Sequence, residues 1–293
     1  MRKKIDIKDK ILLALINIFL LLVFMITVYP FLYVLAVSLS SPQAVMQNKV
    51  FLYPIGINLN AYKVVLDNKA IWVGYKNTLL YTSVGTFVNL LLTSTMAYAL
   101  SKKYLYCRRF FSFIVVFTMF FQGGLIPTYL LVNKLHMINT MWAVIFPYAI
   151  STWNLMIMRT FFMALPPELE EAAYIDGYNP VLVFLKIVLP LSKPIMVTMA
   201  LFYAVTHWNS YFTPFIYLND KSKFPLQITL QQVLIAGSSS FENSSNAVAD
   251  PNLIISDTIK YATIIVSILP VIFIYPFLQK YFIKGMMVGS VKG

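Results

Sequence analysis

Polar and aromatic side chains interrupt otherwise apolar stretches of the sequence at three places. The six residues are Gln122, Trp153, Asn154, His207, Trp208 and Asn209. Sugars are bound by aromatic faces against their C–H surfaces and by Asn, Gln and His hydrogen bonds to their hydroxyls, so this inventory suits a neutral glycan. Polar groups that face a cavity inside a membrane are candidates for a solute path, although Trp and Asn also serve helix packing in lipid.

Adjacent residues on a helix point about 100° apart, so His207, Trp208 and Asn209 cannot all face one cavity. We expect Asn209 and Trp208 on one side, with His207 turned toward a neighbouring helix. Gln122 precedes Gly123-Gly124, a pair that permits a helix to open and line a passage.

The sequence lacks the usual equipment of a soluble enzyme: it has no Walker A loop, no G-x-G-x-x-G, no G-x-S-x-G and no H-E-x-x-H. His136 and His207 lie far apart in the sequence, which argues against a shared metal site. The single cysteine, Cys107, excludes an intrachain disulfide. We therefore expect no catalytic residues, no metal and no cofactor bound by this chain.

The segment 165–193 has the composition of two short helices joined by a turn. Pro166-Pro167 favours a helix start, and Glu168, Glu170 and Glu171 place carboxylates at its positive N-terminal end. Gly177 directly follows Asp176, where a helix C-cap needs a left-handed residue.

A second helix is predicted from Asn179-Pro180 through 181–188, with Pro190 stopping it. Ala172 and Ala173 leave a small, smooth helix face of the kind that lets a partner approach closely. The whole segment is typical of a protruding knob that fits a groove on another protein.

The rest of the chain must hold these groups in a membrane. Of its 293 residues, 59% are hydrophobic and only 12% charged, and the mean hydropathy is +0.73. Soluble chains carry roughly 25% charged residues, so the sequence predicts an all-α polytopic membrane protein. The six candidate membrane spans are about 11–38, 78–100, 110–132, 141–163, 195–218 and 260–282.

The basic residues predict the orientation of the spans. The termini and the segments 101–109 and 165–193 hold 14 Lys and Arg residues, against eight in the longer alternate segments. The positive-inside bias therefore places both termini in the cytoplasm. Nucleic acid is not expected as a partner, because no basic stripe remains once the loops are separated. Arg159, four residues from the cytoplasmic end of its span, is expected to snorkel, with a gating ion pair to a partner subunit as the alternative.

The first apolar run and the loop 219–259 need separate comment. The apolar run 11–37 ends near Ala36-Val37-Ser38, which resembles a signal cleavage site, but a signal core is about 7–15 residues and this run is longer. We interpret it as an uncleaved anchor with Pro30 as a kink. The loop 219–259 is expected to hold a short helix at 226–235 followed by a Ser/Asn-rich tip at 237–246.

The segment 165–193 also carries a recognisable motif. Glu171-Ala172-Ala173, three residues, Gly177, nine residues and Ile187-x-Leu189-Pro190 match the EAA motif of permeases in ABC importers. The segments PPELEEAAYIDG, WNSYFTPFIYL and KGMMVGSVKG resemble the carbohydrate-uptake, maltose-permease type. GGLIPTYLLV and WNLMIMRTFF resemble the branch associated with complex oligosaccharides and polysaccharide fragments.

This resemblance implies a type I ABC importer permease fold, with one permease domain over 1–293. It implies that the EAA loop forms coupling helices that dock into a separate ATP-binding subunit. The residues that correspond to the coupling site are Glu171, Ala172, Ala173, Asp176, Gly177 and Pro190. The implied partners are a second homologous permease in a heterodimer, two ATP-binding subunits that hold ATP and Mg, and an extracytoplasmic solute-binding protein. The tail 284–293 resembles one that reaches between the nucleotide-binding subunits; its alternative is a frayed terminus.

The expected function is transport of oligosaccharide or glycan fragments across a bacterial cell membrane by alternating access, coupled to ATP hydrolysis on the partners. The alternative is an ion-coupled secondary transporter or channel. That class predicts acidic residues buried in the spans, and none of the six predicted spans contains Asp or Glu. An intramembrane enzyme would need a convergent nucleophile, acid or metal set, which the sequence does not offer.

Overall fold

The computed structural model describes residues 7–242 and 257–273, and its regular elements within these ranges are all helices, as predicted. The chain divides into two compact units. One unit comprises residues 1–69 and 230–270, and the other comprises residues 70–229 and 271–293.

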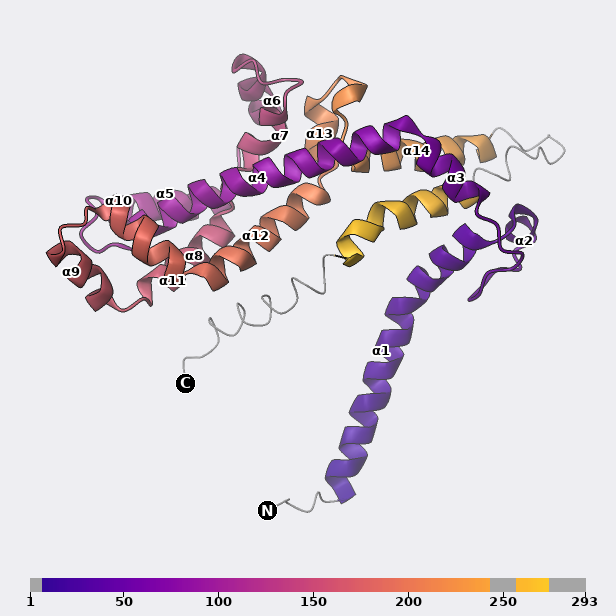
Figure 1. Ribbon diagram of the computed structural model, residues 1–293, viewed down its shortest axis with the longest axis horizontal. Coiled ribbons are helices and arrows are strands. Elements are labelled where there is room, and N and C mark those ends of the chain that lie inside the picture. Colours follow the sequence, from indigo (N-terminus) through magenta and orange to yellow (C-terminus); the bar gives the residue numbers. More distant parts are fainter. Residues whose placement is uncertain (1–6, 243–256, 274–293) are drawn as a thin grey trace. The chain divides into compact units, whose positions relative to one another are not determined.

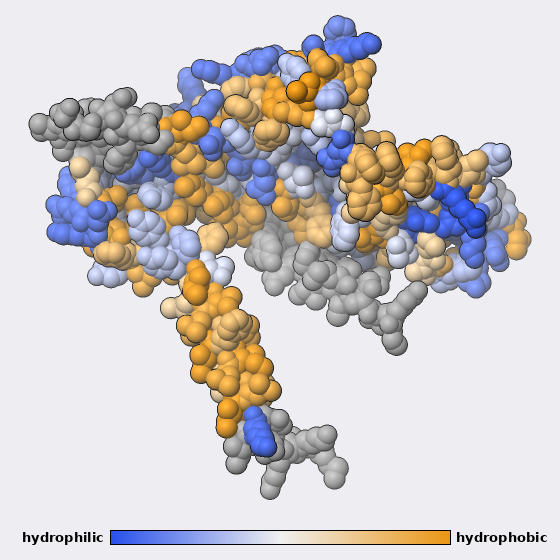
Figure 2. Space-filling view, turned by 180° about the vertical axis from the view of Figure 1, so that it is seen from behind, coloured by the Kyte–Doolittle hydropathy of each residue, from blue (hydrophilic) through white to orange (hydrophobic). Residues whose placement is uncertain are grey.

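Helix α1 (Ile7–Leu39) dominates the first unit (Figure 1). Its residues Lys10–Leu39 are long and apolar enough to cross a membrane. Large side chains such as Phe19, Leu21 and Ile26 are exposed around it, and Figure 2 shows the helix as a nearly continuous apolar surface. The helix continues through Pro30. A helix apolar on all sides is stable in lipid rather than water, so α1 corresponds to the predicted first span.

The last turns of α1 pack against α2 (Pro42–Met46) and α3 (Asn60–Asp67). Ser38 Oγ lies 2.7 Å from the hydroxyl of Tyr62, and Ser40 Oγ accepts a hydrogen bond from the backbone N–H of Ile55 at 3.0 Å. The Ala36-Val37-Ser38 segment is helical and buried. Ala36 and Val37 belong to the small core at this end of α1, and the interpretation of the run as an uncleaved anchor stays a prediction.

The second unit begins with α4 (Lys69–Ser101), which also meets the length and apolarity of a span. The helices that follow are α5 (Arg108–Phe120), α6 (Leu125–Lys134), α7 (Met141–Ile145), the 3-10 turn η1 (Phe146–Tyr148), α8 (Thr152–Met163), α9 (Pro167–Ile175), α10 (Pro180–Val183), the π-helical turn η2 (Phe184–Val188), α11 (Leu189–Leu191), α12 (Lys193–Trp208), α13 (Phe212–Tyr217) and the 3-10 turn η3 (Lys221–Lys223). Helix α14 (Leu226–Glu242) begins in this unit and, from residue 230 on, is part of the first unit.

Three of the predicted spans are interrupted. The predicted span 110–132 consists of α5 and α6, which are bent by 116° where residues 121–124 leave the helix. The predicted span 141–163 bends by 57° before α8. The predicted span 195–218 is a helix only to Trp208, and α13 follows after a break. A third bent pair joins Pro180–Leu191 to α12 at an angle of 83°. By length and composition, two helices in the described part of the chain can span by themselves, and up to five spans result if each of the three bent pairs is one.

The end of the chain is described only in part. A helix occupies 257–273 and overlaps the predicted sixth span 260–282. The remainder of that span, the tail 284–293 and residues 243–246 of the Ser/Asn-rich tip lie outside the described residues. The first part of the predicted tip, 237–242, is helical, because α14 continues to Glu242. The predicted helix at 226–235 is confirmed as the first part of α14.

One buried core joins α4, α5, α8, α9, α10, η2 and α12 at one end of the second unit (Figure 1). Leu155 and Met158 of α8 and Met199 of α12 are almost completely buried in it. The rings of Tyr98 and Phe184 lie 4.9 Å apart, and Phe162 meets Tyr98 edge-on at 6.1 Å. These contacts fix α9 and α10 to the ends of the membrane helices.

Elsewhere in the same unit, hydrogen bonds of Asn139 hold the connection after α13. Asn139, at a φ of 61°, donates its backbone N–H to the carbonyl of Tyr217 at 2.8 Å. Its side-chain oxygen accepts from the N–H of Asp220 at 3.1 Å, while Lys223 donates to its carbonyl at 2.8 Å. A hydrogen bond from the backbone N–H of Ser222 lowers the pKa of the Asp220 carboxyl below its usual range.

Candidate functional site

The six residues predicted for a solute path all lie at the breaks of the interrupted spans. Gln122 is in the break between α5 and α6, Trp153 and Asn154 begin α8, and Trp208 and Asn209 end α12 with His207 beside them. Broken membrane helices expose backbone groups that only a cavity lining or a protein partner satisfies, which is why transport sites form there.

Hydrogen bonds connect these breaks to one another. Thr118 Oγ1 on α5 lies 3.4 Å from Thr152 Oγ1 at the start of α8. The neighbouring backbone N–H of Ser151 donates to the hydroxyl of Tyr203 on α12 at 3.2 Å. The same hydroxyl shares a 2.7 Å hydrogen bond with Thr93 on α4. Tyr203 therefore joins three elements, and sequence reasoning missed it because a single Tyr in an apolar run gives no signal.

His207 turns toward a neighbouring helix, as predicted. Its Nε2 lies 3.2 Å from the side-chain amide nitrogen of Asn89 on α4, one helical turn beyond the Thr93–Tyr203 pair. Asn89 is buried. The imidazole occupies the space above Gly85, where an added Cβ would come within 3.0 Å of three of its atoms. A polar seam thus runs between α4 and α12.

Trp208 and Asn209 do not share a face, contrary to our expectation. Trp208 is buried and its ring lies 6.5 Å from that of Tyr75, whereas Asn209 is the exposed C-cap of α12. The helix ends at Trp208, so the helical spacing on which the expectation rested does not continue to Asn209. Among the other candidates, Gln122 and Trp153 are exposed and Asn154 is buried.

The predicted coupling segment forms a separate structure at the end of the second unit. Helix α9 starts at Pro167 and ends at Ile175, and Gly177 follows with a φ of 82°. Tyr178 donates its N–H to the carbonyl of Ala173 at 2.9 Å, and Gly177 donates to Tyr174 at 3.1 Å. This pair of bonds is the Schellman motif, which confirms the predicted left-handed C-cap at Gly177.

The two alanines of the motif differ in burial. Ala173 is buried in the chain's own core, while Ala172 is exposed. The expected smooth face for a partner therefore includes Ala172 but not the side chain of Ala173. Glu171 and Asp176 are exposed, and neither forms an ion pair with any described residue.

The second helix of the segment differs from its prediction. Asn179 caps it by accepting the N–H of Leu182 at 2.9 Å, as the Asn-Pro pair predicts. Pro190 does not stop it, because helical structure continues to Leu191. In the π-helical turn η2, the N–H of Leu189 bonds to the carbonyl of Phe184, five residues back. This wider turn accommodates a proline, which has no N–H to donate and crowds the preceding turn of an α-helix.

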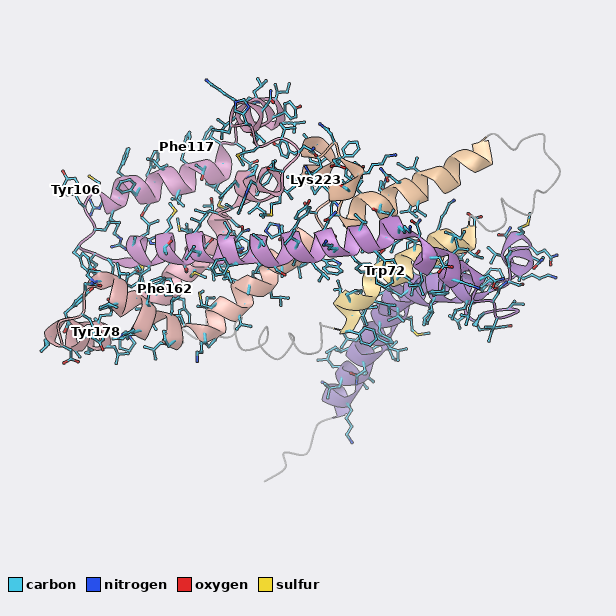
Figure 3. The ribbon with its side chains drawn as sticks, turned by 45° about the horizontal axis from the view of Figure 1, so that its top comes forward. Trp72, Tyr106, Phe117, Phe162, Tyr178 and Lys223 are labelled. Atoms are coloured by element: carbon cyan, nitrogen blue, oxygen red, sulfur yellow. The ribbon has the colours of Figure 1, made fainter. Side chains whose placement is uncertain are left out.

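Two contacts that sequence reasoning missed attach α9 to the connection after α4. Lys102 forms an ion pair with Glu170, and the side chains of both residues are mostly buried. The ammonium also lies 4.3 Å from the centre of the Tyr98 ring. The hydroxyls of Tyr104 and Tyr174 lie 3.2 Å apart. Glu170 alone suggested only a helix-dipole role, and its partner, 68 residues away, leaves no sequence signal. Figure 3 labels Phe162 and Tyr178 at this end of the unit.

An all-helical chain with two long apolar helices, bent helix pairs that meet at polar breaks and a capped helical segment at one end is a membrane protein of the transporter class. The chain belongs to the family of binding-protein-dependent transport system inner membrane components, whose model matches residues 6–288. It is therefore the membrane-embedded permease subunit of an ABC importer, which implies solute-binding and ATPase partners, and the predicted resemblance to this family is confirmed.

Curated relatives extend over nearly the whole chain. It is 42% identical over 286 residues to the polygalacturonan/rhamnogalacturonan transport system permease protein YtcP of Bacillus subtilis, covering 98% of this chain and 100% of the relative. It is 44% identical over 271 residues to the protein LplC of the same organism, covering 92% and 90%. A crystal structure of a bacterial ABC transporter involved in the import of the acidic polysaccharide alginate contains a similar chain, with a TM-score of 0.86 and 34% identity over 94% of this chain and 98% of that one.

Proposed function

We propose that this permease imports oligosaccharide fragments of polysaccharides, acidic ones included. The proposal is supported by the names of the polygalacturonan/rhamnogalacturonan permease and of the alginate importer, which both match over almost their full length. The residues of the predicted path favour sugar rings and hydroxyls, and an acidic fragment additionally carries carboxylates. A bacterial plasma-membrane location, with six spans, cytoplasmic termini and one permease domain over the whole chain, completes the proposal.

Coupling to ATP hydrolysis is proposed to pass through α9 and α10. The supporting observation is that α9 keeps Glu171 and Ala172 exposed, whereas Ala173 and the Gly177 turn anchor it to the chain's own core. Ile175, at 86% exposure, and Val181, at 64%, add apolar side chains beside the motif. Covering these apolar side chains with a partner would stabilise the complex, because it removes apolar surface from water. The rigid attachment through Lys102 and Glu170 would carry a displacement of α9 into α4.

The partners would complete the machine. Two ATP-binding subunits would hold ATP and Mg and hydrolyse the nucleotide, a second homologous permease would form a heterodimer with this chain, and an extracytoplasmic protein would deliver the solute. This chain would then bind no cofactor itself. Alternating access would follow from closure of the ATP-binding subunits, because a rigid coupling helix transmits their rotation to the spans.

For the solute path, the exposed candidates Gln122, Trp153 and Asn209 are proposed to contact the sugar. His207, Trp208 and Asn154 are more enclosed and would shape the wall behind them. The path would run past the connected breaks of the second unit.

The function is tested by reconstituting the complete importer in liposomes with its binding protein. We expect acidic oligogalacturonides to stimulate ATP hydrolysis and to accumulate inside the vesicles, with maltotriose as the matched neutral sugar. Stimulation by maltotriose without any stimulation by oligogalacturonides would contradict the import of acidic fragments. Transport that persists without ATP but follows an imposed proton or sodium gradient would contradict the ABC mechanism and favour the secondary transporter.

A further inference from the structure

An open, basic pocket of about 510 Å³ lies where α5 begins, apart from both the solute path and the coupling segment. It is lined by Arg108, Arg109, Ser112, Phe113, Val116 and Arg159. The arginines come from two elements that are distant in sequence, the start of α5 and the last part of α8.

The positive charge of this pocket is incompletely compensated. Nε of Arg108 and Nε of Arg159 donate to the same acceptor, the carbonyl of Leu100, at 3.0 and 3.1 Å. Their other contacts are to thioether sulfurs, at 3.7 Å from Arg108 to Met163 and 3.9 Å from Arg159 to Met156. A guanidinium has five N–H donors, and sulfur is a weak acceptor. Within the described ranges, none of the three arginines forms an ion pair.

A buried hydroxyl beside the arginines also lacks a hydrogen-bond partner. Ser112 Oγ is shielded from solvent and has no hydrogen-bond partner among the described residues. A buried polar atom without a partner costs free energy, and a rotation of the Ser112 side chain toward the pocket would let an oxygen of a bound anion satisfy it. The first turn of α5 also presents the positive end of its dipole.

The remaining walls of the pocket are apolar. Phe113 and Val116 line it directly, and α5 carries further exposed rings at Phe110, Phe117 and Phe120. Figure 3 labels Phe117 on this helix. A phospholipid offers both a charged headgroup and acyl chains, and Arg is well suited to phosphate because its planar fork binds two oxygens together.

We propose that this pocket binds the phosphate of an anionic phospholipid, with the arginines and Ser112 on the headgroup and the α5 phenylalanines along the chains. In the proposed topology this lipid belongs to the cytoplasmic leaflet, whose anionic surface attracts basic residues next to the membrane. The site would hold the end of α8 and the start of α5 against the end of α4, to which both arginines already bond.

The test uses the assembled importer in nanodiscs of phosphatidylcholine with or without phosphatidylglycerol. Arg109→Gln is the principal variant, because Arg109 is exposed and makes no hydrogen bond to Leu100 that folding would lose. Lys103→Gln is the matched control: it removes the same charge from the connection just before α5, at a residue that does not line the pocket. Ser112→Ala keeps every charge and tests the hydroxyl.

We expect phosphatidylglycerol to raise the melting temperature of the parent and of Lys103→Gln, and native mass spectrometry to find the lipid retained by both. Arg109→Gln should retain it several-fold less and lose most of the thermal gain, with Ser112→Ala in between. Equal retention by Arg109→Gln and the parent would overturn the site. Equal protection by inorganic phosphate in detergent would show a free-anion site and overturn the lipid. Release of the ATP-binding subunits by Arg109→Gln, with lipid retention unchanged, would assign the surface to a protein. Failure of the topology is distinguishable, since labelling of Cys107 reports it independently of lipid retention.

Discussion

The imidazole of His207 rests directly on Gly85, with no room for a side chain between α12 and α4. The same ring contacts Asn89 one turn further along α4. A glycine at this point therefore determines how closely the two helices approach and where the histidine lies. Neither helix reveals this alone, because the glycine and the histidine are far apart in sequence.

Replacing Gly85 by Ala should push His207 off Asn89. An added methyl in a packed interior costs about 1–3 kcal/mol, so we expect the importer to melt several degrees lower and uptake to fall. Gly123→Ala is the control, because its nearest contact would be Pro127 at 3.9 Å. The double variant Gly85→Ala, His207→Ala should recover most of the stability, as measured by thermal denaturation. A double variant as unstable as the sum of the two single variants would refute the contact.

Replacing Gly177 by Val should uncouple the importer. At a φ of 82°, a β-branched residue is strongly disfavoured, whereas Asn tolerates the left-handed region. We expect Gly177→Val to reduce uptake by at least tenfold and to weaken pull-down of the ATP-binding subunit, with the protein still in the membrane. Gly177→Asn should retain most activity. An added Cβ at Gly177 would meet no atom within 4 Å, so the structure predicts no steric clash for either variant. Equal loss of uptake in both variants would contradict this explanation, because it would mean that any side chain at this position is harmful, whatever its backbone preference.

Charge reversal tests the attachment of α9. Lys102→Glu and Glu170→Lys each leave two like charges facing one another in a mostly buried site. A charged hydrogen bond contributes about 1.5–3 kcal/mol, so each variant should lose ATP-coupled uptake and thermal stability. Combining the two reversals should restore a large part of both. Lys103→Glu serves as the control for charge alone; a comparable loss in that variant would remove the ion pair from the explanation.

Cys107 tests the topology. It is exposed at the start of α5, next to Arg108 and Arg109. A membrane-impermeant maleimide should label it in inverted vesicles and not in intact cells, and Cys107→Ser should abolish the signal. Labelling from outside would reverse the proposed orientation, and with it the access of α9 to cytoplasmic ATP-binding subunits.

Asn209 tests the solute path. It is exposed at the end of α12, so Asn209→Leu should leave the melting temperature nearly unchanged. We expect weaker or altered sugar uptake with intact assembly and basal ATP hydrolysis. Trp208→Ala is the contrasting variant: its ring is buried, so stability and every activity should fall together. Parent-like transport by Asn209→Leu would exclude this position from the path.

Local patterns were enough to predict the helices and caps. Pro166-Pro167 at the start of α9, Asn179-Pro180 at the start of α10 and the glycine after α9 act within a few residues, and the structure confirms all three. Likewise the apolar length of 11–38 was sufficient to predict α1.

Contacts between distant segments were beyond the sequence. Tyr203 with Thr93, Lys102 with Glu170 and His207 with Gly85 each pair residues more than 60 positions apart. The break after Trp208 was also missed, since an apolar run cannot reveal where its helix stops. The predicted helix end at Pro190 was wrong. A proline usually stops an α-helix, but the wider π-helical turn before it lets the helix continue.

The π-helical turn η2 also fixes the number of residues between α10 and α12. It holds one residue more than an α-helical turn would, and it lies between the start of α10 and the beginning of α12. Deleting one residue there would replace the π-helical turn by an α-helical one and rotate everything upstream by about 100° about the helix axis. The face of α9 would then point away from its partner with every motif residue still present. Gaps in alignments of functional relatives should therefore avoid 180–191, however freely the individual side chains vary.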